Sequence, residues 1–583
     1  MKELWLIDCR GVSSVASLSK MVALVKLDLT GTAVSDIKPI EKCIRMKEFI
    51  MNGCSALRCV APLSGMVSLE TLSLSGTGVS DLAPLTRCER MKHLRLDGCS
   101  GVQSVEPVFG MENLEVLHLN DTAVYDIDPL AHCVLMEELV LNGCSGVESI
   151  APLSAMNNLQ VVHLIGTGVT DLAPLALCGA MKELLLMDCH GVSSVAALSR
   201  MGALERLDLT GTAVSDVTPL ACFHAMRKLV LKGCSGVNSV AALSGMGALE
   251  RLDLTRTAVE DLSPLRDCGL KVLNLSDCHA VKSFLPLADI RGLEKLDLSG
   301  TTVKDVGPLA NCSLMRELVL TGCGCVDNVA SLYNMVALEK LDLSGTGVSD
   351  IGPLKRCTNI KQLILKGCRA VKNIEPLSSM TVLQTLDLTD TGVDDLTPLC
   401  GSHQVRTLIV KRCSAVNSIS PLEGMLALEK LDLTGTTVEH LVPLRHCNQL
   451  KELVVSGCSR VQSIASVSRI KSLDKLDLTR TAVEDLSPLR DCGLKVLNLS
   501  DCHAVNDISP LAFLSGLEKL DLSGTAVNDV ARLARCTMMK ELVLNGCGRV
   551  DSVASLPALC LLEKLDLSGT DVRDLGPLSN VTG

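Results

Sequence analysis

The fold is decided by the stretch MKELLLMDCHGVSSVAAL at residues 181–198 and by LERLDLTGTAVSDVTPL, which follows it at residues 204–220. Both stretches carry leucine at their fourth and sixth positions, and at the ninth position the first has Cys189 and the second has Thr212. Side chains alternate between the two faces of a strand, so both leucines of an L-x-L point inward and the residue between them points outward. Each stretch therefore predicts one short strand of a repeating structure.

The two stretches alternate along essentially the whole chain. A cysteine repeat of 23 residues is followed by a threonine repeat of 22, and the pair recurs after 45 residues, or in two places after 44, which gives 26 repeats. A single repeat cannot bury its own apolar edge, so neighbouring repeats must stack. We predict one domain over residues 1–583, an α/β-type repeat solenoid with a parallel sheet on its concave side. The D-L-x-P-L half of the threonine repeat predicts a short 3₁₀ or extended return on the convex side.

Composition and charge restrict the function. Hydrophobic residues make up 47% of the chain and aromatic residues only 1%, so the core must be aliphatic. The net charge of −11 and the scarcity of aromatic side chains disfavour a nucleic-acid partner, which needs basic surface and stacking platforms. No segment resembles a secretory signal or a membrane span, so we expect a cytoplasmic protein. Neither end carries a capping segment, which leaves open that the chain is part of a longer protein.

Two repeat classes are visible in these residues. LEKLDLSGTAVNDV at residues 517–530 resembles the internalin and SDS22-like class of leucine-rich repeats, and the C-x-x-V segments at residues 189–192 and 234–237 resemble the cysteine-containing class. Their alternation is similar to that of protozoan leucine-rich-repeat proteins described as adenylate cyclase regulators. This resemblance implies a leucine-rich-repeat horseshoe or superhelix that binds a protein partner, with a cyclase as one such partner. Some members of that family carry a RING-type zinc finger, which this sequence lacks.

The 28 cysteines follow the repeat instead of forming a metal or disulfide pattern. Thirteen occupy the ninth position of the cysteine repeats, and ten more lie four residues after the proline position of the threonine repeats. Equivalent cysteines are two strands apart, roughly 9 to 10 Å, which is too far for a disulfide. We therefore expect reduced, buried, structural thiols. The spacing predicts no metal site and no cofactor, and because no catalytic motif is present we expect no enzyme activity.

Charged residues on the predicted concave face form a regular ladder. The third position is basic in nine of the thirteen threonine repeats and is Glu in seven of the cysteine repeats, so opposite charges should meet on neighbouring strands. Asp occupies the fifth position in ten threonine repeats. These regular aspartates indicate either a structural role or general attraction of a basic partner.

The ladder fails across residues 71–163, where three successive threonine repeats lose both the basic residue and the aspartate. Departure from a self-consistent repeat marks candidate specificity, and the alternative is neutral drift. Histidines two strands apart could also be read as metal ligands, a less favoured interpretation. The candidate partner-binding residues are His93, Arg95, Asp97, His118, Asn120, Tyr125 and His163. Trp5, outward-facing by its position, is a further possible anchor.

The leading hypothesis is a non-catalytic, cytoplasmic scaffold or regulatory subunit that binds a protein through its concave face. An extracellular adhesin or antigen of internalin type is the alternative. An enzyme is the third and least favoured hypothesis. The sequence alone names neither the partner nor the oligomeric state.

Overall fold

The computed structural model describes residues 1–580, in which 26 strands alternate with 26 short 3₁₀ helices. The chain divides into two compact units: the N-terminal unit, Met1–Leu293, and the C-terminal unit, Glu294–Gly583. Strands β1 to β13 belong to the first and β14 to β26 to the second. The single domain over residues 1–583 stays a prediction.

Every element of the N-terminal unit is short. Its strands are β1 (Glu3–Trp5), β2 (Lys26–Asp28), β3 (Glu48–Ile50), β4 (Thr71–Ser73), β5 (His93–Arg95), β6 (Val116–His118), β7 (Glu138–Val140), β8 (Val161–His163), β9 (Glu183–Leu185), β10 (Arg206–Asp208), β11 (Lys228–Val230), β12 (Arg251–Asp253) and β13 (Val272–Asn274). Its helices are η1 (Ala16–Lys20), η2 (Lys38–Ile40), η3 (Ala61–Gly65), η4 (Ala83–Leu85), η5 (Glu106–Gly110), η6 (Asp128–His132), η7 (Ala151–Ala155), η8 (Ala173–Leu177), η9 (Ala196–Arg200), η10 (Thr218–Cys222), η11 (Ala241–Leu243), η12 (Ser263–Leu265) and η13 (Leu285–Asp289).

The C-terminal unit repeats the same alternation. Its strands are β14 (Lys295–Asp297), β15 (Glu317–Val319), β16 (Lys340–Asp342), β17 (Gln362–Ile364), β18 (Thr385–Asp387), β19 (Thr407–Ile409), β20 (Lys430–Asp432), β21 (Glu452–Val454), β22 (Lys475–Asp477), β23 (Val496–Asn498), β24 (Lys519–Asp521), β25 (Glu541–Val543) and β26 (Lys564–Asp566). Its helices are η14 (Gly307–Asn311), η15 (Ala330–Asn334), η16 (Gly352–Arg356), η17 (Glu375–Ser379), η18 (Thr397–Leu399), η19 (Ser420–Gly424), η20 (Val442–His446), η21 (Ala465–Arg469), η22 (Ser487–Leu489), η23 (Ser509–Phe513), η24 (Ala531–Arg535), η25 (Leu556–Ala558) and η26 (Gly576–Asn580).

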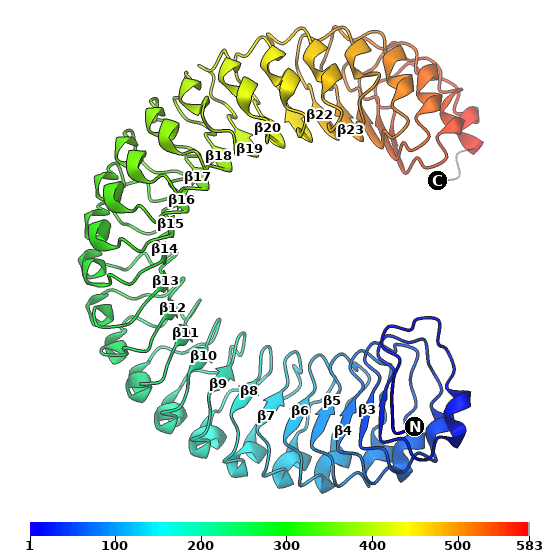
Figure 1. The fold of residues 1–583 in the computed structure, drawn as a ribbon, viewed down its shortest axis with the longest axis vertical. Coiled ribbons are helices and arrows are strands. Elements are labelled where there is room, and N and C mark those ends of the chain that lie inside the picture. The colour runs from blue at the N-terminus through cyan, green and yellow to red at the C-terminus, as the bar shows by residue number, and fades with distance from the viewer. Residues whose placement is uncertain (581–583) are drawn as a thin grey trace. The chain divides into compact units, whose positions relative to one another are not determined.

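Within each unit, consecutive strands pair in parallel and in register, so the same repeat position meets itself on the next strand. Between β5 and β6, for example, His93 faces Val116 and Arg95 faces His118. The strands line the inner side of each unit and the 3₁₀ helices its outer side (Figure 1). The predicted parallel sheet and short 3₁₀ returns are therefore confirmed.

The inward leucines form the core between the strands and the helices of each unit. Leu94 and Leu96, the L-x-L pair of β5, are both 0% exposed, and the same positions are buried in nearly every other repeat. At its outward-facing position in β1, Trp5 is 57% exposed, as predicted. No buried side-chain nitrogen or oxygen within residues 1–580 lacks a hydrogen-bond partner.

In most threonine repeats, aspartate and proline together begin the outer helix. Asp81 Oδ1 accepts a hydrogen bond of 2.8 Å from the backbone N–H of Ala83, the first residue of η4, and Pro84 follows it. In most cysteine repeats a serine takes this place with a longer bond, as in the 3.3 Å contact from Ala16 N to Ser14 Oγ, and in others an Asn or Asp takes it, as Asn328 does at 2.8 Å from Ala330 N. The aspartate of D-L-x-P-L thus bonds a nearby backbone amide at the start of the predicted 3₁₀ return.

The ninth-position cysteines are joined to the threonine repeat that precedes them. Cys234 Sγ lies 3.1 Å from the carbonyl oxygen of Leu209 and 3.4 Å from Thr212 Oγ1, and that hydroxyl itself donates to Leu209 O at 2.8 Å. These cysteines are free thiols. One prediction is wrong: Cys9 is exposed, whereas the other twelve ninth-position cysteines are buried against the threonine repeat before them.

Candidate functional site

The outward residues at the third and fifth repeat positions form what we call the strand face of each unit. The predicted third-position ladder is confirmed there. Glu317 lies between two lysines, with Lys340 Nζ 2.5 Å from Oε1 and Lys295 Nζ 3.2 Å from Oε2, and these cations lower the pKa of Glu317 although partial burial opposes them. Equivalent ion pairs join Lys26 to Glu48, Arg206 to Glu183, Lys430 and Lys475 to Glu452, and Lys519 and Lys564 to Glu541.

A second ladder of opposite sense runs along the second position, which sequence reasoning missed. Lys361 Nζ lies 2.6 Å from Glu339 Oε2, and Lys451 Nζ lies 2.7 Å from Glu429 Oε2. Here the cysteine repeat supplies the cation and the threonine repeat the carboxylate. The signal was present in the sequence, because cysteine repeats read M-K-E-L where threonine repeats read L-E-K-L.

The fifth-position aspartates have a structural role. Asp208 Oδ1 accepts hydrogen bonds from the backbone N–H of Thr210 at 3.0 Å and from its hydroxyl at 2.6 Å, and Asp253 makes the same pair with Thr255. An aspartate that bonds the N–H two residues on closes a local turn. Of the two interpretations that the sequence left open, the structure favours this one.

Between β3 and β8 the turn is stabilised differently. Seventh-position side chains accept N–H groups from the next repeat: Asn52 from Ser75 at 3.1 Å, Asp97 from Asn120 at 3.2 Å, Asn120 from Asn142 at 3.0 Å, and Asn142 from Ile165 at 3.0 Å. This cross-strand network replaces the local aspartate turn, so the fifth position is free to carry other residues. Ser73, His118 and His163 occupy it in β4, β6 and β8.

His118 lies between two carboxylates from the flanking repeats. Its Nε2 is 2.9 Å from Glu138 Oε1, a hydrogen-bonding distance, and its Nδ1 is 3.8 Å from Asp97 Oδ2, an ion-pair separation. The interaction with Asp97 and then that with Glu138 raise the pKa of His118, although partial burial opposes them. Burial acts to raise the pKa of Asp97, but the interaction with His118 and hydrogen bonds from Asn120 and Ser75 outweigh it and lower that pKa.

The other two histidines have carboxylate neighbours of their own. His93 Nδ1 lies 3.2 Å from Thr71 Oγ1, and its Nε2 is 3.7 Å from Glu115 Oε2. His163 Nε2 is 3.2 Å from Glu183 Oε1. The three rings are thus held separately on β5, β6 and β8.

Arg95 differs from the histidines because its guanidinium makes no ion pair or side-chain hydrogen bond within residues 1–580. It faces Ser73 on one side and His118 on the other. Of the predicted residues, Asp97, His118 and Asn120 are in direct contact, and His93, Arg95 and His163 share the face with them. Tyr125 does not join them: it lies in the segment between β6 and η6, 65% exposed, beside Gly146.

Solved structures of other proteins share this architecture. TLR13, solved as a TLR13–ssRNA13 complex, matches with a TM-score of 0.53 over 97% of this chain and 91% of its own, at 15% identity. PEPR1, solved with AtPEP1, matches with a TM-score of 0.51 over 96% of this chain and 84% of its own, also at 15% identity. An internalin from Listeria monocytogenes is 24% identical over 55% of this chain and 88% of its own, with a TM-score of 0.45. No protein-family model and no curated protein matches the chain.

The fold is that of leucine-rich repeats. At these identities the likeness is one of fold, and it confirms the predicted fold class of a leucine-rich-repeat solenoid for both units. Within the leucine-rich repeats of residues 1–580, no cluster of three or more His, Cys, Asp or Glu side chains is placed to hold a metal ion. In the same residues, no helix is both long enough and apolar enough to span a membrane.

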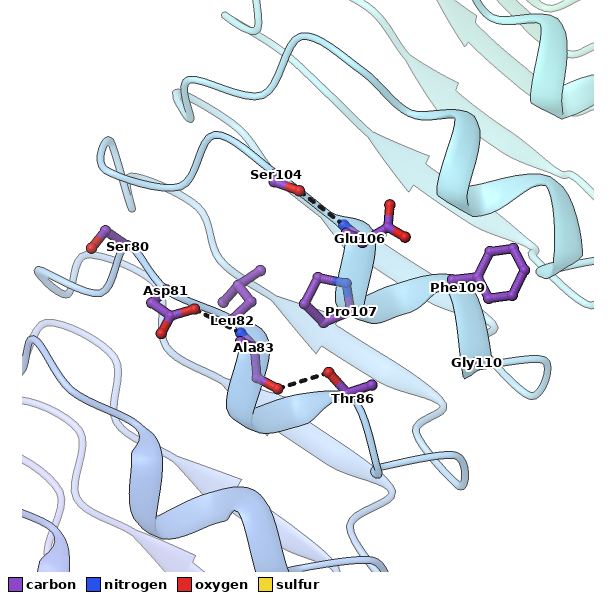
Figure 2. A pocket seen from close by; sticks show the side chains of 10 residues that line it. All are labelled: Ser80, Asp81, Leu82, Ala83, Thr86, Ser104, Glu106, Pro107, Phe109 and Gly110. Atoms are coloured by element: carbon purple, nitrogen blue, oxygen red, sulfur yellow. Dashed lines mark hydrogen bonds between the residues drawn. The ribbon is translucent and has the colours of Figure 1, made fainter.

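The outer side of the leucine-rich repeats is hollowed between neighbouring helices. One hollow, of about 430 Å³, lies between η4 and η5. Figure 2 shows its lining: Asp81 and Ser104 bond the first amides of the two helices, and Phe109 points away from the hollow. An equivalent hollow of about 430 Å³ lies between η2 and η3. Because the polar groups of the drawn hollow serve helix starts and the hollow recurs with the repeat, we attribute it to repeat geometry.

Buried thiols of the leucine-rich repeats are poor nucleophiles. Burial raises the pKa of Cys88 and Cys178 to about 11 and that of Cys133 to about 12, so the reactive thiolate is scarce at neutral pH. Exposed thiols occur outside the two regular positions, at Cys59, Cys325, Cys400 and Cys560.

Proposed function

We propose that this protein is a non-catalytic scaffold or regulatory subunit that binds a protein partner on the strand face of its N-terminal unit, between β4 and β8. One observation carries the proposal: the charge ladder is interrupted there, and the cross-strand network of Asp97 and Asn120 frees the fifth position for His118 and His163. In a continuous ladder each charged side chain is paired with another side chain of the same protein. An interrupted one leaves side chains available to a partner.

The chemistry of this region suits a protein surface. Val116 and Val161 stand at the third position, where most threonine repeats carry a cation, and they offer apolar contacts. Arg95, on the neighbouring strand β5, adds a guanidinium that has no ion pair within residues 1–580. Protein interfaces combine apolar patches with arginine anchors and a polar rim, and an arginine with no partner in its own chain can pair across an interface without losing an existing bond.

The test is a pull-down from lysate with quantitative mass spectrometry, comparing the wild type with the variant His93→Ala, Arg95→Ala, His118→Ala and His163→Ala. A matched control changes three histidines and one arginine that are exposed outside the strands: His132, His224, His279 and Arg45. We expect a partner retained by the wild type and the control and lost by the strand-face variant. Equal recovery by all three proteins would refute this location of the site.

As a first partner to test we propose an adenylate cyclase, on the strength of the repeat resemblance. Adding the purified protein to a membrane preparation that contains the cyclase should change the rate of cyclic AMP formation, and the strand-face variant should not change it. An unaltered rate at saturating wild-type protein would remove the cyclase from the proposal and leave the binding role intact.

We also propose that the protein acts in the cytoplasm, which its many free thiols support because such thiols persist in a reducing compartment. A membrane-impermeant maleimide applied to intact cells should leave Cys59 and Cys400 unlabelled. Labelling before lysis would favour the alternative, a surface adhesin.

A further inference from the structure

The strand face of the N-terminal unit carries a second departure from the ladder, which begins two strands after His163. The third positions of β10, β11 and β12 are Arg206, Lys228 and Arg251. Arg206 pairs in register with Lys228, and Lys228 with Arg251. We call these three residues the cationic row.

In other cysteine repeats the middle position of such a row is most often a glutamate, which pairs with the cations on both sides, as Glu317 does. Lys228 reverses that sign. Like charges directly opposite each other on neighbouring strands destabilise a sheet, and adjacent strands are only about 4.8 Å apart. The row is therefore an arrangement that folding alone does not favour.

The carboxylates near the row are already engaged. On one side Glu183 binds Arg206 at 2.9 Å, and on the other side the next third-position residue is Val272. In the second-position ladder, Glu205 lies 3.7 Å from Arg227 and Glu250 lies 3.1 Å from Lys271.

The fifth-position carboxylates are also used. Asp208 is only 7% exposed and bonds Thr210, and Asp253 bonds Thr255. Lys228 and Arg251 consequently make no ion pair within residues 1–580. A further lysine without an ion pair, Lys232, follows on the β11 side of the same region.

We propose that the cationic row binds the carboxylates of an acidic protein segment. This inference rests on the proposed binding role of the strand face and adds the chemical class of the partner. Successive strands present the cations about 4.8 Å apart, whereas residues on one side of an extended peptide recur after about 6.6 Å, and the long side chains of Arg, Lys and Glu can span this difference. A peptide lying across the strands can thus meet all three.

A protein segment fits better than a nucleic acid. The chain carries a net charge of −11, so a long polyanion would be repelled outside the row. A short acidic segment needs only the row itself. The test therefore includes a nucleic acid, whose binding in place of the peptide would contradict the proposal.

The experiment uses the full chain and a fluorescein-labelled peptide of ten glutamates, followed by fluorescence anisotropy at low salt. We expect binding to the wild type, weakened by about tenfold or more in Lys228→Glu, which removes one attraction and neutralises both neighbours. Lys228→Arg should retain binding. Lys42→Glu, the same charge change on an exposed lysine outside the strands, should leave binding unchanged.

Thermal unfolding supplies a readout that distinguishes binding from damage. Because Lys228→Glu restores the ladder between Arg206 and Arg251, its melting temperature should equal or exceed that of the wild type. Equal affinity of wild type and Lys228→Glu, no binding to the wild type, or binding of a 20-nucleotide single-stranded RNA in place of the peptide would each overturn the proposal. The variant with four alanines on β5 to β8 should still bind the peptide. The proposal for the cationic row can therefore be refuted without refuting the proposed partner site around the histidines.

Discussion

The shared carbonyl of the threonine–cysteine pair makes a prediction that can be worked out in energy. Leu209 O accepts the backbone N–H of Thr212 at 3.1 Å, the hydroxyl of the same threonine at 2.8 Å, and the thiol of Cys234 at 3.1 Å. Thr212→Val removes one side-chain donor and Cys234→Ala removes the other. Either single variant leaves one side-chain donor on the carbonyl.

The magnitudes follow from this sharing. Loss of the Thr212 hydroxyl bond should lower the free energy of unfolding by about 1 kcal/mol, a typical net value for one hydrogen bond. Cys234 is 0% exposed, and deletion of its sulfur should cost about 1 kcal/mol in lost packing and a weak bond. The double variant leaves no side-chain donor on Leu209 O, so it should lose about 0.5 to 1 kcal/mol more than the sum of the single variants.

Native-state hydrogen exchange read by mass spectrometry is the suitable assay, because repeat arrays can open locally and this method reports the opening of one pair of repeats. Peptides that cover residues 205–236 report the opening free energy of this pair. A control cycle combines Thr212→Val with Cys178→Ala, whose thiol lies 3.5 Å from Met156 O in another repeat, and it should be additive. If the Thr212–Cys234 cycle is also additive within about 0.3 kcal/mol, the shared-carbonyl explanation is wrong.

Three further predictions concern titration and reactivity. Because Asp97 and Glu138 raise the pKa of His118 above 6.5, its imidazole NMR signal should titrate above that pH, and Asp97→Asn should lower the midpoint of this titration. The stability that His118 contributes is fully present below its unfolded pKa and is lost as pH rises through its folded pKa. An unchanged midpoint in Asp97→Asn would argue against the pairing of His118 with Asp97. The lysines beside Glu317 lower its pKa below 4.5, so the stability that the ionised Glu317 gives the fold is lost as pH falls through its folded pKa. Thermal melts between about pH 5 and pH 3 should therefore show the wild type losing more stability than Glu317→Gln. Equal losses in the two proteins would contradict the ion pairing of Glu317. Exposed Cys59 and Cys400 should react with an aromatic disulfide reagent within minutes in native protein, whereas Cys133, with its pKa raised to about 12, should react only in denaturant; peptide mapping of a fast-reacting Cys133 would contradict its burial.

Most of the fold could be predicted from the sequence because local sequence rules determine the geometry of each repeat. L-x-L fixes which side chains point inward, the period fixes the stacking, and proline fixes the outer return, so the strand of residues 93–95 and the helix of residues 83–85 follow from local rules. The third-position ion pairs were predictable for the same reason, since in-register stacking carries one repeat position onto the next strand. The second-position ion pairs could have been predicted from the same repeat pattern but were missed.

The candidate site could be predicted only in part. Interruption of the repeat pointed to residues 71–163, but sequence reasoning grouped Tyr125 with the histidines although it belongs to the segment after the strand. It also did not find the cross-strand network that connects Asp97, Asn120 and Asn142. Those bonds join residues 22 or 23 positions apart, and their existence depends on which way each side chain turns.

By itself, then, the sequence determined the strand positions, the buried leucines and the residues that face one another on adjacent strands, because a strict period makes position in the repeat equivalent to position in space. Only the tertiary structure decided how each polar atom is used. The fifth-position aspartates close turns, His118 meets carboxylates from both neighbouring strands, and Lys228 stands between two arginines with no acid free to pair with it. A hydrogen bond or an ion pair requires atoms to come within about 3 to 4 Å, and that condition is set by rotamers and strand spacing together.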